Sequence, residues 1–246
     1  MGSVNRRTHN GPARRSHPAP SSADRSSERR SQADRRRQTR RALLDAALEQ
    51  MDGGYGFDSL SLRRVARAAG VVPTAFYRHF DGMDELGLAL VEESAATLRA
   101  MLREAREGGP GEAGSGLIAR SVEILVAHVR EHRRHFAFMA HARASGNAVL
   151  RHAIRAETRL FASELATDIA RLPVLRDWTT ADLQMLAGLF VDTMIATIDA
   201  VLEASSAGAG AGAEGISPDA EARIVTQAEK QLRLIALAIP HWRSHT

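Results

Sequence analysis

Apolar residues recur every three or four positions along most of the chain, a spacing that places their side chains on one face of an α-helix. The first such stripe consists of Leu43, Leu44, Ala47, Leu48 and Met51. Stripes of the same period continue to the C-terminal part, where the last runs over residues 224–239. No segment has the alternation of a β-strand, so the pattern predicts an all-α protein.

Breaking and capping residues divide the first part of this pattern into short helices. Gly53 and Gly54 end the first helix, which we expect to begin near Asp34. Ser61 is placed to cap a second helix, and Gly70 stops it. Pro73 suits the first position of a third helix, which we expect to run to Phe80.

The apolar pattern after Phe80 predicts longer helices. Asp81 can cap a long fourth helix, and Asn147 and Thr180 can cap later ones. Breaks are expected at residues 108–116, at Pro173 and in the Ala- and Gly-rich residues 205–215. The helices expected between these breaks cover residues 117–129, 132–145, 147–172 and 180–202.

The first 33 residues are rich in Arg, Ser, Pro and Gly and poor in large apolar side chains, which predicts a disordered tail. Residues 1–41 carry 12 Arg and 3 acidic residues, although the whole chain has a formal net charge of only +4. A basic arm of this kind attracts phosphate beside a nucleic-acid-binding domain. A solubilising extension explains the composition equally well.

Composition narrows the class of protein further. Hydrophobic residues make up 44% of the chain, enough for a packed core, and there is no cysteine, which fits a reducing cytoplasm. We find no apolar run long enough to cross a membrane and no signal-peptide pattern. A nucleophile elbow, a phosphate-cradling glycine loop and a paired-carboxylate motif are also missing, so we expect no enzyme activity and no cofactor.

The segment LSLRRVARAAGVVPTAFYRHF, residues 60–80, has the physical features of a helix-turn-helix. Ala66 and Ala69 are small enough for two short helices to approach closely. Phe76 and Phe80, four residues apart, bury the inner face of the second helix and leave polar groups outward. Hydroxyl, phenol, guanidinium and imidazole groups suit phosphates and base edges in the major groove. The predicted DNA contacts are Arg40, Ser61, Leu62, Arg63, Thr74, Ala75, Tyr77, Arg78 and His79.

This segment resembles the TetR family of bacterial repressors. Their pattern combines a helix ending in A-x-x-A-G-V, a short recognition helix ending in Tyr-x-His-Phe and a long fourth helix. The matching residues are Ala66, Ala69, Gly70, Val71, Tyr77, His79, Phe80 and Leu86. The resemblance implies a DNA-binding domain over residues 34–81 and a larger helical domain over residues 82–246 that dimerises and holds an effector. A homodimer on a palindromic operator in double-stranded DNA follows, in a bacterial cytoplasm and at the nucleoid when DNA is bound.

A finer resemblance is to the FabR- and DesT-type repressors of fatty-acid synthesis. It is carried by residues 73–106 and by QLRLIALAIPHWR, residues 231–243. It implies control of lipid-metabolism genes by a long-chain acyl-CoA or acyl-carrier ligand. The alternative is another hydrophobic effector, such as a drug, an efflux substrate or a signalling lactone. The residues expected to meet the effector are Phe136, Phe138, Met139, Arg143, Arg151, Leu160, Phe161, Phe190 and Met194.

Four histidines, His128, His132, His135 and His141, follow one another on adjacent helical turns. Histidines at positions i and i+4 share a helix face and can bind a metal together. Only Glu123 and Glu131 lie near them in the sequence, so solvated helix-face histidines are the favoured interpretation. We assign no metal ligand from the sequence.

Overall fold

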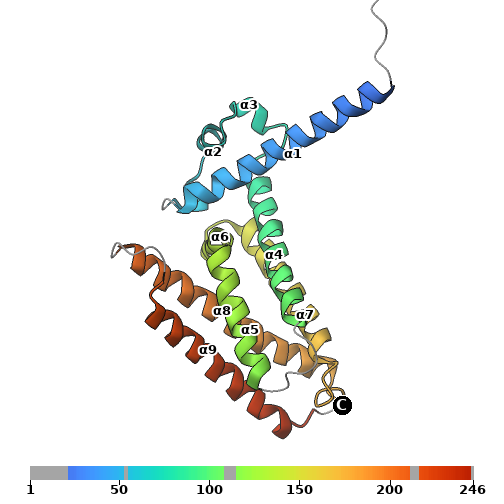
Figure 1. The fold of residues 1–246 in the computed structure, drawn as a ribbon, viewed down its shortest axis with the longest axis vertical. Helices are drawn as coiled ribbons and strands as arrows, with labels where there is room; N and C mark the ends of the chain where they lie inside the picture. The colour runs from blue at the N-terminus through green and yellow to red at the C-terminus, as the bar shows by residue number, and fades with distance from the viewer. Residues whose placement is uncertain (1–21, 53–54, 108–114, 211–215, 245–246) are drawn as a thin grey trace, which may run out of the picture. The chain divides into compact units, whose positions relative to one another are not determined.

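The computed structural model describes residues 22–52, 55–107, 115–210 and 216–244, which form helices and loops without any strand (Figure 1). This confirms the predicted all-α fold class. Internal contacts divide the chain into residues 1–39 and residues 40–246. The division falls inside the first helix, α1 (Ser22–Asp52).

Helix α1 begins at Ser22, well before the Asp34 expected from the apolar pattern. The prediction of disorder is therefore wrong for residues 22–33, and residues 1–21 lie outside the described part of the chain. Extending an existing helix adds hydrogen bonds without a second nucleation step, and the segment is rich in helix-forming Arg, Ala, Glu and Gln. Within residues 1–39, Arg37 pairs with Asp34.

The remaining helices are mainly long. After the 3-10 turn η1 (Phe57–Ser59) come α2 (Leu62–Ala68), α3 (Pro73–Phe76), α4 (Met83–Glu107), α5 (Ser115–Glu131), α6 (Arg133–Ala144), α7 (Ala148–Ile169), α8 (Thr180–Gly210), α9 (Pro218–Ala238) and η2 (Ile239–His241).

Most predicted helix boundaries agree with these bounds, with instructive exceptions. The Asn147 side chain caps α7 by accepting a hydrogen bond from the Leu150 amide at 3.1 Å, as expected. Helix α8 is capped by Thr179 instead of Thr180, because the Thr179 hydroxyl accepts from the Asp182 amide at 3.2 Å. Helix α8 also continues to Gly210, so the loop predicted from Ser205 is wrong over residues 205–210. The Ser205 and Ser206 hydroxyls donate to the carbonyls of Val201 and Leu202, one turn back in the helix. The break expected at residues 108–116 falls mostly outside the described residues.

One buried cluster joins the helix-turn-helix to the helices that follow it. Phe76 and Phe80 share this cluster with Leu86 and Leu90 of α4, and α6 and α7 contribute Phe138 and Leu150 among others. A second cluster fills the space between α4, α5, α8 and α9. The core of residues 40–246 therefore extends across the boundary predicted at residues 81 and 82.

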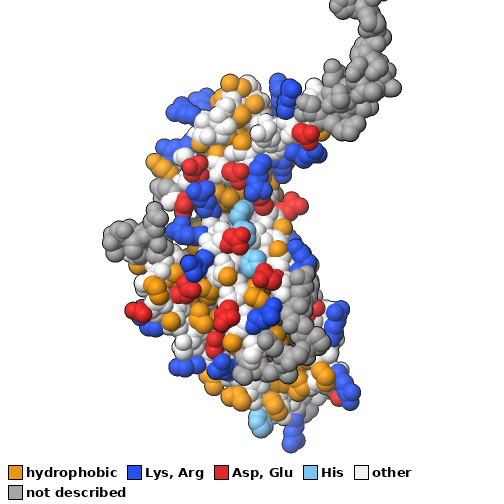
Figure 2. Space-filling model, in the orientation of Figure 1, with side chains coloured by type: hydrophobic (Ala, Val, Ile, Leu, Met, Phe, Trp, Pro, Cys, Tyr) orange, Lys and Arg blue, Asp and Glu red, His pale blue; other side chains and the backbone are white. Residues whose placement is uncertain are grey.

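Helix α8 is long and apolar enough over Thr180–Ala207 to cross a membrane, judged by length and composition alone. The sequence analysis did not identify this run. The helix packs against α7, α9, α5 and α6, while Met185 and Leu189 remain exposed on it. Figure 2 shows apolar side chains at the surface in the region of α8 and α9.

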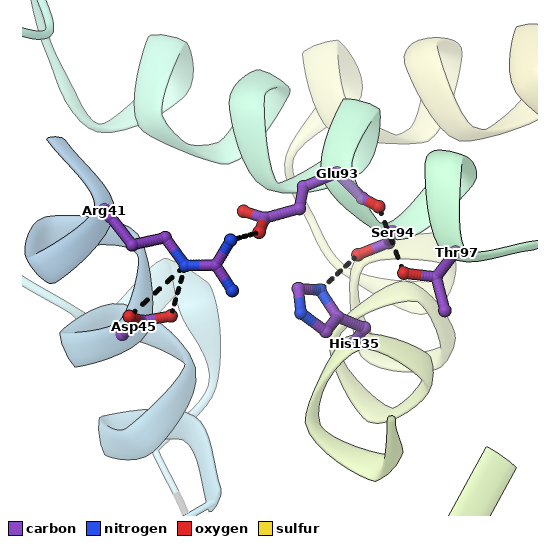
Figure 3. Close-up of polar contacts among 6 residues, drawn as sticks. All are labelled: Arg41, Asp45, Glu93, Ser94, Thr97 and His135. Carbon is purple, nitrogen blue, oxygen red and sulfur yellow. Dashed lines mark hydrogen bonds and ion pairs between the residues drawn. The ribbon is translucent and has the colours of Figure 1, made fainter. Parts of the chain in front are cut away.

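Polar contacts connect the C-terminal part of α1 to α4 (Figure 3). The Arg41 guanidinium lies 3.1 Å from the Asp45 carboxylate and 2.5 Å from that of Glu93. The neighbouring Ser94 hydroxyl lies 3.2 Å from Nδ1 of His135, on α6. These contacts link the C-terminal part of α1 to α4, and α4 in turn to α6.

Burial lowers the pKa of His135 below its ordinary value of 6.5. The positive charge of Arg41 and the neighbouring His132 act in the same direction, whereas Glu93 and Asp45 raise the pKa and oppose it. The folded protein therefore keeps this imidazole neutral at a pH where the unfolded chain already binds a proton.

Gly87 marks a close approach between α4, α7 and η1. A Cβ atom at this position would lie 2.8 Å from Leu150 Cδ2 and 2.8 Å from Phe57 Cζ, and both of those side chains are buried. We predict that Gly87→Ala lowers the free energy of unfolding by about 1–2 kcal/mol, because the overpacking exceeds the gain in helix propensity. Chemical denaturation checks this, and a more stable variant would contradict it.

The lowered pKa of His135 predicts that stability falls with pH below about 6.5, because the unfolded chain then binds more protons than the folded one. Denaturation at about pH 7.5 and about pH 5.5 gives the change in free energy of unfolding between them. We expect a smaller loss in His135→Gln than in the wild type. The exposed His152 provides the control, since His152→Gln should keep the wild-type loss. Equal losses in all three proteins would refute the prediction.

Candidate DNA-binding site

The turn between α2 and α3 is a Schellman motif. The Val71 amide donates to the Ala66 carbonyl at 2.9 Å, and the Gly70 amide donates to that of Arg67 at 3.1 Å. Gly70 has a φ of 70°, a left-handed conformation that glycine adopts at little cost. The predicted stop at Gly70 thus has a specific backbone cause, and the turn sets the direction in which the next helix leaves.

We define residues 73–80 as the recognition segment. Its helix α3 ends at Phe76, earlier than the predicted Phe80. Beyond it the backbone tightens into turns, with the His79 amide donating to the Phe76 carbonyl at 2.8 Å. The side chains of Phe76 and Phe80 are almost fully buried, with ring centroids 5.5 Å apart. The inner face of the segment is therefore held by the core, as the four-residue spacing predicts.

The outer face of the recognition segment carries the polar groups that the sequence placed there. Thr74, Tyr77 and Arg78 are exposed, and the Tyr77 side chain is 62% exposed. Ala75 and His79 are half-buried at the rim. A hydroxyl, a phenol and a guanidinium on one short surface provide donors for base edges and phosphates.

The predicted contacts on α2 fall into three different environments. Arg63 is exposed. Ser61 caps the helix, its hydroxyl accepting from the Arg64 amide at 3.3 Å. Leu62 is half-buried and packs against the core, which limits it to the edge of the surface. The sequence analysis did not include Arg64 among the candidate DNA contacts. Its guanidinium lies 4.1 Å from the centre of the exposed Tyr55 ring. The adjacent pair of arginines, Arg63 and Arg64, could have indicated it.

Arg40 lies against the end of the recognition segment. Its guanidinium donates to the His79 carbonyl at 3.3 Å and lies 4.4 Å from the centre of the Phe80 ring. A cation over an aromatic ring is attracted to it. The structure thus gives Arg40 a positioning contact that neither its place in the sequence nor its charge predicted.

An apolar cavity of about 50 Å³ lies between α4, α6, α7 and α8. Of the residues predicted to meet an effector, Met139, Phe161 and Met194 line it. The other lining residues are Ala95, Leu98, Arg99, Glu157, Thr158, Val191, Ile195 and Ile198. Arg99 is the cation at this cavity; it pairs with Glu157, and its Nε lies 3.5 Å from a Glu164 carboxylate oxygen.

The other predicted effector residues lie outside that cavity. Phe136 and Phe138 belong to two different core clusters, Phe190 packs beside the core and Leu160 is exposed. Arg143 pairs with Asp199 at 2.7 Å, and Arg151 donates to the Ser145 carbonyl at 2.6 Å. Helical period alone did not separate the side chains that line a cavity from those that fill a core.

Residues 43–90 match the family model described as bacterial regulatory proteins, tetR family. The match covers the end of α1, the helix-turn-helix and the beginning of α4. It therefore includes the Schellman turn and the whole recognition segment.

Several solved structures share the fold over most of their length. A transcriptional regulator from Rhodococcus sp. Rha1 is 19% identical with a TM-score of 0.58, and the similarity covers 82% of this chain and 96% of that one. The fatty acid degradation regulator FadR from Bacillus halodurans is 14% identical with a TM-score of 0.60, covering 79% and 94%. GusR from Salmonella enterica is 23% identical with a TM-score of 0.56, covering 79% and 95%.

These identities establish a common fold, and the family match lies on the helix-turn-helix itself. Residues 43–90 are therefore similar to the segment that the TetR-family model describes, on a fold shared with solved transcriptional regulators.

Proposed function

We propose that the protein is a repressor that binds a palindromic operator as a homodimer and responds to a hydrophobic effector. The observation that carries this proposal is the recognition segment, whose inner aromatic face is buried while Thr74, Tyr77 and Arg78 are exposed. Such a segment inserts into the major groove of double-stranded DNA in helix-turn-helix proteins. The implied location is a bacterial cytoplasm, with association with the nucleoid while DNA is bound.

Apolar surface on the last two helices supports the dimer. Leu234 and Leu237 on α9 are each 68% exposed, and Met185 and Leu189 on α8 are exposed as well. Helices α8 and α9 pack against each other, so a second copy can add its own pair to form a four-helix interface. A two-fold axis through that interface relates two recognition segments, which is why a palindromic operator is expected.

For the effector we propose a long-chain acyl group carried by coenzyme A or by an acyl carrier. Support comes from the resemblance of residues 73–106 and 231–243 to fatty-acid repressors and from the apolar lining of the cavity. FadR from Bacillus halodurans, described as a fatty acid degradation regulator, shares only the fold with this chain, so its description adds little support for an acyl effector. Ligand pockets usually enclose about 300–1,000 Å³, so the cavity of about 50 Å³ has to widen for an acyl chain.

A different hydrophobic effector is the second candidate. The narrow cavity favours it, because a compact molecule displaces fewer side chains than an acyl chain does. The pairing of Arg99 with Glu157 also favours it, since a guanidinium already held by carboxylates is less available to the phosphates of a thioester carrier.

DNA binding tests the main proposal. A pool of random DNA duplexes is selected with the wild-type protein at low salt, and the enriched sequence is expected to be palindromic. Tyr77→Ala should weaken binding to it about tenfold or more, because a good base contact contributes about 1–3 kcal/mol. Arg171→Ala, an exposed arginine in the turn after α7, is the matched control and should bind like the wild type. The proposal fails if no sequence is enriched or if Tyr77→Ala binds like the wild type.

Thermal denaturation with candidate ligands tests the effector. We expect palmitoyl-CoA to raise the melting temperature of the wild type, because a ligand that binds only the folded state stabilises it. Met139→Trp fills the cavity and should remove that shift. Leu160→Trp is the control, because exposed Leu160 lies outside the cavity. A shift with uncharged apolar compounds but with no acyl-CoA would favour the second candidate.

A further inference from the structure

The corner between α5 and α6 brings together three side chains of the kind that bind transition metals. His128, Glu131 and His132 each offer one ligand atom, and these atoms lie within 4.8 Å of one another. The imidazole rings of the two histidines are stacked with centroids 5.7 Å apart. Figure 2 shows histidine side chains grouped beside acidic ones on the face of the molecule turned to the viewer.

A fourth side chain comes from a different helix. Glu104, on α4, places a carboxylate oxygen 2.7 Å from Nε2 of His128. The two residues are 24 positions apart, so the sequence analysis, which considered only Glu123 and Glu131, missed this carboxylate. Two imidazoles and two carboxylates form a donor set that binds zinc and similar ions.

The environment of His128 does not fit a solvated helix-face histidine. Its side chain is only 13% exposed, and its Nδ1 atom is buried without a hydrogen-bond partner among the described residues. Its polar contact is therefore the one that Nε2 makes with Glu104. A buried imidazole directed at a carboxylate and stacked on a second imidazole is the arrangement of a ligand cluster.

The other ligands leave room for an ion. The Glu131 and Glu104 side chains are 73% and 56% exposed, so both carboxylates can move. Zinc bonds of about 2.0–2.2 Å require ligand atoms about 3.3 Å apart, so the ligand atoms of His128, Glu131 and His132, which lie within 4.8 Å of one another, have to approach by up to about 1.5 Å. Glu131 and His132 also line an open pocket.

Nearby positive charge is partly offset. Arg133 and Arg134 line the same pocket, but both pair with Asp52, Arg134 at 3.5 Å. Each of the two carboxylates of the cluster adds a negative charge. The local field therefore does not oppose a cation at this corner.

From this geometry we propose that His128, Glu131, His132 and Glu104 form a binding site for a divalent first-row transition-metal ion such as Zn²⁺. The two imidazoles select such ions over Mg²⁺ and Ca²⁺, which prefer all-oxygen ligand sets. The site is separate from the recognition segment and shares no lining residue with the apolar cavity.

Cobalt titration of the full-length chain, stripped of metal with a chelator, tests the site directly. Bound Co²⁺ should produce visible absorption bands that saturate at one ion per chain and disappear on addition of Zn²⁺. His132→Ala and Glu104→Gln should each weaken binding tenfold or more. His128→Gln is expected to do the same. Because the His128 side chain is only 13% exposed, this variant is also the one whose folding the substitution disturbs most.

His141→Ala is the matched control, because His141 is an exposed α6 histidine whose Nδ1 lies 2.8 Å from the Ala137 carbonyl oxygen. It should bind Co²⁺ like the wild type. Circular dichroism before each titration verifies that a variant is folded. The proposal is overturned if the wild type gives no saturable bands, or if folded His132→Ala binds as tightly as the wild type.

Discussion

Burial of the Phe76 and Phe80 rings is the constraint on which the recognition segment depends. A four-residue helix has no stability of its own, because nucleating a helix costs more than its few hydrogen bonds return. The segment keeps its form because both rings enter a cluster shared with α4, α6 and α7. Arg40 adds a contact from α1 to the His79 carbonyl and the Phe80 ring. The exposed groups on the outer face are therefore positioned by side chains from distant parts of the chain.

This shared core offers a route by which the proposed effector would influence the recognition segment without touching it. Phe138 belongs to the cluster around Phe76, and its neighbour Met139 lines the apolar cavity. A ligand that widens a cavity of about 50 Å³ has to displace α4 or α6 relative to α7 and α8. Close-packed side chains respond to such a displacement by shifting together. The proposed effector would thus change DNA affinity to the extent that it binds the two arrangements unequally.

The helical fold and the recognition segment could be predicted from the sequence, because they depend on neighbouring residues. Contacts between residues far apart in the chain could not be predicted. The period of the apolar residues indicates the helices. Their ends are indicated by Gly70, Pro73 and Asn147, because each of these residues acts on the backbone next to it. The early start of α1 and the extension of α8 to Gly210 depend on helix propagation, which no stop signal reveals. The cavity lining was only partly predictable, because helical period distinguishes inside from outside but not a filled core from a cavity. The placement of Glu104 against His128 required the packing of α4 on α5.

Helix α4 contacts, one after another along its length, the cluster around the recognition segment, the apolar cavity and the histidine corner. Leu86 and Leu90 pack in the cluster around the recognition segment, and Glu93 and Ser94 make the polar contacts to α1 and α6. Leu98 and Arg99 line the cavity, and Glu104 reaches the histidines at the α5–α6 corner. At 1.5 Å per residue, the span from Leu86 to Glu104 is about 27 Å of continuous helix. Because a helix transmits displacement along its axis better than a loop does, an ion that holds Glu104 and a ligand that contacts Leu98 act on the same rigid element. Binding of the proposed ion and binding of the proposed ligand should therefore depend on each other, as expected for two sites that bias one structural equilibrium.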